Sequence, residues 1–189
     1  MVSGSDPMAQ RLTVLFLILF CAACAPTLDR LSSSGTAPGW SQNGANGLRP
    51  QIVSTAAHLE CVPYAREQSG IPIRGDAWTW WQSADGLYQR SRRPSIGSVL
   101  VLSRGGHLNG GHLAVVTAIL NSREIVVRHA NWLNRGQIHI DTPVIDVSGA
   151  NDWSAVRVWY TPGATYGART YPASGFIHPE RLALLSGQG

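Results

Sequence analysis

The chain has 189 residues, of which 44% are hydrophobic and 14% charged. That length and composition suit one domain with a real core plus tails, and no internal repeat indicates a repeat architecture. The formal charge is +4 because fifteen basic residues, all of them Arg, outnumber eleven acidic ones. No basic helix or aromatic-basic motif accompanies this charge, so we expect a solvated surface and no nucleic-acid partner.

The first elements along the chain are those of an export signal. Arg11 precedes an apolar run over residues 12–20, and two alanines then lead into Cys24. A positive start, an apolar middle and a small-residue cleavage site make up a signal peptide. The run is too short to span a bilayer, which takes about 20 apolar residues.

Small residues that end in Cys resemble the lipobox of bacterial lipoproteins. The resemblance implies that residues 1–23 are removed and that Cys24 becomes a lipidated N-terminus holding the protein on a membrane. Cys21 departs from the pattern, because that family carries Leu there. The competing cut, after Ala25, would place Pro26 first, which ordinary signal peptidase tolerates poorly.

A lipidated Cys24 predicts a protein on the periplasmic side of the cell envelope. The two residues after it lack the Asp that retains lipoproteins at an inner membrane, which favours the outer membrane. Residues 24–50 are rich in Ser, Gly, Pro and Asn and predict a flexible tether. Once the signal is removed and Cys24 carries lipid, Cys61 is a lone thiol in an exported protein, either reactive or inert in the core.

The compact domain is expected over residues 51–160. Residues 58–69 predict a helix that places Cys61 at its N-terminus and tolerates Pro63 in its first turn. Residues 76–83 predict a second, short helix capped by Asp76. Strands are predicted over 97–102, 112–120, 124–131, 137–140 and 154–160, and residues 161–189 are expected to form an irregular C-terminal tail. Helices followed by strands indicate an α+β domain with an antiparallel sheet.

A thiol at a helix N-terminus is a good nucleophile, because the helix dipole and unpaired backbone N–H groups favour the thiolate. It needs a base, and His112, which opens a strand after two glycines, is the candidate. If Asn121 and Ser122 form a two-residue hairpin loop, His112 lies opposite Asn131. His129 is then its diagonal neighbour on the same face, about 7–8 Å away.

Either Asn131 or His129 can therefore orient the imidazole of His112. His107 and His112 lack a third ligand at useful spacing, so no metal site is expected. Trp80, Trp81 and Trp132 are candidates for a substrate groove, although core packing accounts for most of the seven Trp residues.

Five blocks in this order resemble a CHAP domain, named for cysteine, histidine-dependent amidohydrolase/peptidase. The resemblance covers residues 51–160 and rests on the segments 60–66, 75–80, 94–99, 111–116 and 129–132. Cys61 matches the family nucleophile, His112 its base and Asn131 its polar Asn. His129 stands where that family often has an acidic residue, and the related NlpC-type endopeptidases use a His as their third member.

The resemblance implies a papain-like fold, with an N-terminal helix that carries Cys61 packed on an antiparallel sheet that carries His112. It also implies hydrolysis of peptidoglycan amide bonds through a thioester, with no cofactor. Two alternatives stay open: an amidase for a small peptide or amide metabolite, and a catalytically silent lipoprotein that binds cell-wall peptides. The sequence does not separate amidase from endopeptidase and does not fix the oligomeric state.

Overall fold

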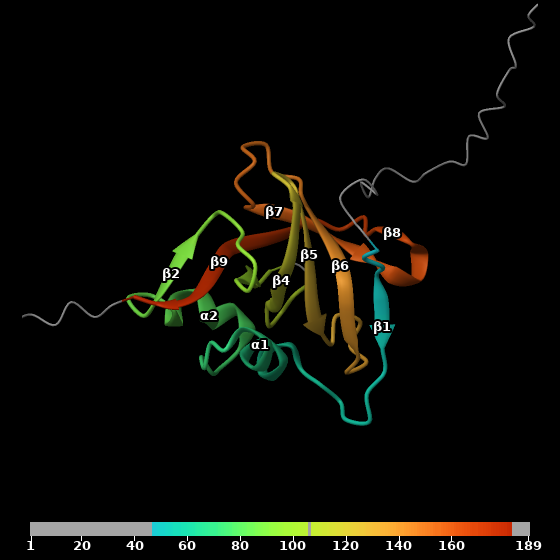
Figure 1. Ribbon diagram of the computed structural model, residues 1–189, viewed down its shortest axis with the longest axis horizontal. Helices are drawn as coiled ribbons and strands as arrows, with labels where there is room; N and C mark the ends of the chain where they lie inside the picture. Colours follow the sequence, from blue (N-terminus) through green and yellow to red (C-terminus); the bar gives the residue numbers. More distant parts are fainter. Residues whose placement is uncertain (1–46, 106, 183–189) are drawn as a thin grey trace, which may run out of the picture. The chain divides into compact units, whose positions relative to one another are not determined.

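The computed structural model describes residues 47–105 and 107–182, which are mostly sheet (Figure 1). The predicted signal peptide, Cys24 and the tether up to residue 46 lie outside the described residues. Within the described part of the chain, no helix is long and apolar enough to cross a membrane.

Six antiparallel strands close into a barrel. They follow one another around it in the order β6, β5, β4, β3, β9, β7, and β7 pairs back onto β6. Their bounds are β3 Val99–Leu102, β4 His112–Asn121, β5 Glu124–Ala130, β6 Ile138–Asp146, β7 Ala155–Tyr160 and β9 Tyr171–Arg181. Three shorter strands extend the sheet: β1 (Gln51–Val53) on β6, β2 (Tyr88–Ser91) on β9 and β8 (Thr165–Tyr166) on β7.

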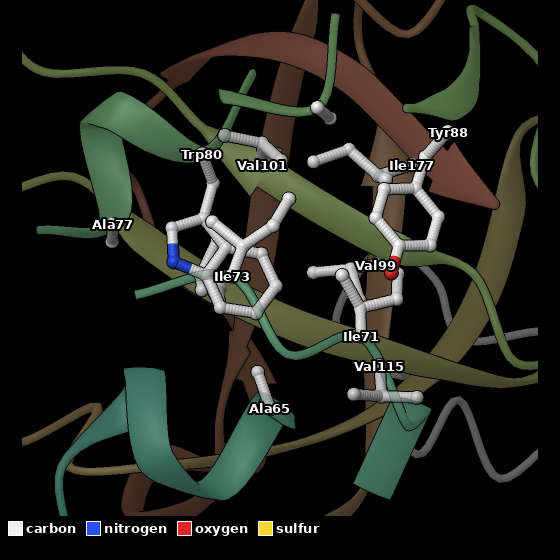
Figure 2. Close-up of a cluster of buried hydrophobic side chains, with 12 residues drawn as sticks. Ala65, Ile71, Ile73, Ala77, Trp80, Tyr88, Val99, Val101, Val115 and Ile177 are labelled. Atoms are coloured by element: carbon white, nitrogen blue, oxygen red, sulfur yellow. The ribbon is translucent and has the colours of Figure 1, made fainter. Parts of the chain in front are cut away.

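Alternation along the strands divides the apolar residues between two cores, because successive side chains point to opposite faces. Leu100 belongs to a cluster with members from all six barrel strands, which therefore fills the barrel interior. Val101 belongs to a second cluster between the outer face of the barrel and the helices. Figure 2 shows this outer cluster, in which Val101 and Ile177 come from strands and Trp80 from a helix.

The helices are short and cover one side of the barrel. Helix α1 (Cys61–Ser69) packs against β4 and β5, and the 3₁₀ turn η2 (Ala77–Thr79) runs into α2 (Trp80–Ser83), which contacts β9 (Figure 1). The prediction started α1 three residues early. Leu59 donates its backbone N–H to Gly136 O, which holds the chain extended up to Cys61.

The structure confirms the predicted fold class only in part. The predicted antiparallel sheet is present, but it closes into a barrel, and helix contributes only short segments. The prediction of an irregular tail over residues 161–189 is wrong, because residues 171–181 form a barrel strand between β3 and β7. Proline and glycine, which usually interrupt strands, concealed it. Gly175 is required there, since a Cβ would lie 2.5 Å from Ser91 O.

The β4–β5 hairpin turns one residue later than predicted. Asn121 pairs with Glu124, and its side-chain oxygen accepts a hydrogen bond from the backbone N–H of Arg123, which fixes the turn at residues 122–123. Two register shifts follow along the ladder. After these shifts Val115 pairs with Arg128, as the prediction requires. The end of the hairpin nearest His112 therefore has the predicted register.

The barrel should depend on β9. Phe176 is fully buried in the interior and packs edge-to-face on Trp153, with ring centroids 5.5 Å apart. Phe176→Ala should lower the free energy of unfolding by about 3–5 kcal/mol, measured by urea denaturation, because it leaves a cavity. The control Ile96→Ala, at a side chain 68% exposed, should change it by less than about 0.5 kcal/mol. Equal effects would contradict β9 as a core strand.

Candidate active site

A cavity of about 750 Å³ opens where the start of α1 meets one end of the barrel. Its wall includes the first residues of α1 and β4, the turn after β5, and the segment between β8 and β9. Among the residues predicted for the site, Cys61, His112, Asn131 and Trp132 line it. A cavity of this size is sufficient for a small ligand or part of a peptide.

Cys61 is the first residue of α1, where backbone N–H groups have no partner within the helix. The preceding Glu60 makes no side-chain cap, which leaves those groups available. Burial raises the pKa of the Cys61 thiol, while hydrogen bonds from the backbone of Leu113, Cys61 and Val62 lower it by less. The contact with Leu113 places the thiol beside the first residues of β4.

His112 is held at the start of β4 by a tight approach of three chain segments. It pairs with Leu102 on β3 and is only 5% exposed. The preceding Gly111 has φ 69°, and a Cβ there would lie 2.8 Å from both Leu102 O and Trp78 N. Only glycine fits this position, which explains the glycine that precedes the histidine in the sequence.

His129 makes the hydrogen bond that orients His112. His112 Nε2 lies 2.9 Å from His129 Nδ1, and both rings are buried. Trp132 packs edge-to-face on His112, with ring centroids 4.8 Å apart. Nε2 is therefore occupied, and Nδ1 is the His112 nitrogen left to exchange a proton with a ligand in the cavity.

Asn131, the other candidate from the hairpin argument, bonds elsewhere. Strand β5 ends at Ala130, and Asn131 turns into the left-handed region with φ 60°. Its Nδ2 donates to Glu60 Oε2 at 2.8 Å, and its Oδ1 accepts the backbone N–H of Gly136. Asn131 thus ties the residue before Cys61 to the turn after β5.

Burial favours the neutral forms of both the Cys61 thiol and the His112 imidazole. Burial, with repulsion from His139, lowers the pKa of His112 to about 3, and burial likewise lowers the pKa of His129. The pKa of the Cys61 thiol is raised, again by burial. Because burial penalises the charged form of each group, a neutral thiol and a neutral imidazole are favoured until a ligand changes the surroundings.

The three tryptophans predicted for a substrate groove lie in different parts of the structure. Trp132 lines the cavity. Trp80 is completely buried in the outer core, so its assignment to a groove is wrong. Trp81 packs against that core and stacks under the Arg90 guanidinium, 5.0 Å from the ring centroid. The sequence reasoning missed His139, which the pairing of β6 with β5 places opposite His129.

Stability should fall as the pH drops below about 6.5. The folded state keeps His112, His129 and His139 neutral with lowered pKa values, whereas the unfolded chain takes up protons at its ordinary pKa of about 6.5. Stability is therefore complete only well above pH 6.5 and decreases as the pH falls through 6.5 toward 5, by up to about 1.4 kcal/mol per pH unit for each site. Urea unfolding across this range should show the slope, and His129→Phe should reduce it.

The exposed His107 supplies the control, since His107→Gln should leave the slope unchanged. An unfolding free energy that is constant between pH 7 and 5 would contradict the buried neutral histidines.

Comparison with known proteins gives two findings and one negative result. Residues 51–131 match the CHAP domain family. A solved structure of an N-acetylmuramoyl-L-alanine amidase from Staphylococcus aureus is similar with 22% identity and a TM-score of 0.41. That match covers 64% of this chain and 37% of the amidase chain, and at this level it does not establish a shared fold. No curated protein matches the chain.

The family match spans α1 with Cys61, the start of β4 with His112 and the end of β5 with His129 and Asn131. It ends before β6, β7 and β9, which the barrel requires. The chain therefore contains a CHAP domain, at residues 51–131.

Proposed function

We propose that this protein is a cysteine-dependent hydrolase that cleaves amide bonds of peptidoglycan, as an amidase or endopeptidase. One observation carries the proposal: Cys61 and His112 line one cavity, and His112 is hydrogen-bonded to a third buried residue, His129. Helix α1 with the thiol packs on the strands with the histidines, as in the papain-like arrangement that the family resemblance implies. The CHAP match supports peptidoglycan as the substrate class.

The first chemical step forms a thioester. Cys61 Sγ attacks the amide carbon as its proton passes to Nδ1 of His112, whose Nε2–H donates to Nδ1 of His129. Backbone N–H groups at the start of α1 stabilise the oxyanion. His112 Nδ1–H then protonates the leaving nitrogen, the C–N bond breaks, and the amine departs.

The second step returns the enzyme to its starting state. Neutral His112 takes a proton from water as the water oxygen attacks the thioester carbon. The tetrahedral intermediate collapses, the C–S bond breaks, and the proton on His112 returns to the Cys61 thiolate. Because burial favours the neutral forms of Cys61 and His112, the proposed His112 acts as a general base during attack, which differs from a preformed thiolate–imidazolium pair.

The N-terminal sequence supports a place for this activity. We infer that Cys24 carries lipid and holds the domain on the periplasmic face of an envelope membrane, with residues 24–50 as the tether. A tethered hydrolase reaches the cell wall near its membrane, and the residues after Cys24 favour the outer membrane.

Purified sacculi test the proposed reaction. The wild-type protein should release soluble wall fragments, and Cys61→Ala should abolish release because it removes the proposed nucleophile. The control His178→Gln should retain activity, since His178 is bonded to Ser91 and Ser95 and is not part of the cavity wall. Mass spectrometry of the products distinguishes an amidase from an endopeptidase.

Release that persists in Cys61→Ala would overturn the cysteine mechanism. Binding to sacculi without release by the wild type would favour the silent lipoprotein. Neither release nor binding, with a reactive Cys61, would favour an amidase for a smaller amide.

Alkylation by iodoacetamide tests the neutral resting pair. Burial raises the pKa of Cys61, so thiolate should be scarce at pH 6, and the rate should rise roughly tenfold per pH unit through neutral pH. Mass spectrometry locates the label on Cys61, and an unstructured cysteine peptide gives the reference curve. A rate at pH 6 that already equals the maximal rate would instead indicate a preformed ion pair.

A further inference from the structure

A third histidine, His139, continues the line of rings that begins at the cavity. It lies on β6 directly opposite His129 on β5, and it is 1% exposed. The rings of His129 and His139 meet edge-to-face with centroids 5.2 Å apart, and those of His112 and His129 at 5.1 Å. Three neighbouring strands of the barrel thus contribute one histidine each.

Several polar atoms around His139 lack a partner within the described residues. They are His129 Nε2, both ring nitrogens of His139, and Thr142 Oγ1, all of them buried. Thr142 pairs with Val127, which belongs to the core of the barrel interior. Paired residues share a face, and Val127 and His129 lie two residues apart on β5, so the Thr142 side chain is on the same face of the sheet as His129 and His139, across a register shift between the two pairs.

The tautomers that the proposed reaction requires give these atoms a role. For His112 to accept the thiol proton at Nδ1, its own N–H must stand at Nε2 and donate to His129 Nδ1. A neutral His129 that accepts at Nδ1 carries its proton at Nε2. That second N–H points to the polar atoms of the interior and needs an acceptor there.

We propose that His139 is a positioning residue of the Cys61–His112 pair, acting through an enclosed water that it holds together with Thr142. The water accepts the Nε2–H of His129 and donates to a His139 nitrogen and to Thr142 Oγ1, about the three bonds usual for a buried water. This fixes the His129 tautomer, and His129 in turn fixes His112. The proposal rests on the proposed function.

The surroundings keep His139 suited to this role. Burial lowers the pKa of His139, so it stays neutral and keeps a lone pair to accept a hydrogen bond. The titratable group that faces it from β5 is His129, with His112 beyond on β4. Its partner on β1 is Ile52, which carries no charge. His129 and His139 are not hydrogen-bonded to each other, since Nε2 of His129 and both nitrogens of His139 have no partner among the described residues. In the proposed arrangement a bridging water joins them at little cost.

Nitrogen-15 NMR of the histidine rings tests the tautomer without any substrate. In the wild-type protein, His129 should carry its proton at Nε2 and His112 should carry its proton at Nε2. His139→Phe keeps a ring of similar shape and removes both nitrogens, so His129 should lose its single tautomer. Thr142→Val should do the same to a lesser degree, and the control Thr117→Val, on the half-buried part of β4, should change nothing.

Kinetics on sacculi supply the second readout. His139→Phe should lower kcat by about tenfold with KM unchanged, as expected for a group that orients a catalytic one. His139→Gln, which retains a hydrogen-bond acceptor, should recover part of the loss. The melting temperature of His139→Phe should fall only slightly, because the ring packing is retained while the bridging water loses one hydrogen-bond partner.

One result would overturn the proposal: an unchanged His129 tautomer in His139→Phe, even if kcat falls together with the melting temperature. If wild-type protein does not act on sacculi, the proposed substrate fails, and the NMR comparison still decides the role of His139.

Discussion

Insertion of β9 between β3 and β7 closes the sheet, and the other features of the domain depend on that closure. It creates an interior that Phe176 and its neighbours fill, and an outer face on which the helices pack. A closed sheet also has no free edge among its six strands, so the backbone of each is paired on both sides. The cavity lies at one end of this closed body, where strand ends and loops meet.

Closure also determines the chemistry that the histidines can perform. The interior face that carries mostly aliphatic side chains along the barrel carries His112, His129 and His139 near the cavity. Burial keeps these rings neutral, which preserves the lone pairs that a base and its orienting partners require. The same burial removes water from competition, so a few hydrogen bonds are enough to fix each tautomer.

The start of α1 is fastened to the barrel by separate contacts. Asn131 holds Glu60 from the turn after β5, and Leu59 bonds to the same turn through Gly136. Gly111 lets β4 approach Trp78 and Leu102 more closely than any side chain allows. These contacts place Cys61 next to Leu113, so two segments about fifty residues apart in the sequence form one site. Preorganisation of this kind lowers the entropy lost on reaching the reactive geometry.

By itself, the sequence determined the elements whose signals are local. Helical spacing with an early proline predicted α1 and put Cys61 at its start, and alternation and turn residues predicted the β4–β5 hairpin and the two candidates beside His112. Tertiary structure decided what depends on distant pairing. Asn131 lies beyond the end of β5 in the left-handed region, and His129 is the residue hydrogen-bonded to His112. Proline and glycine concealed β9, which local propensity disfavours and pairing on both sides stabilises. The place of His139 also depends on pairing, because no local pattern reveals which strand will lie beside another.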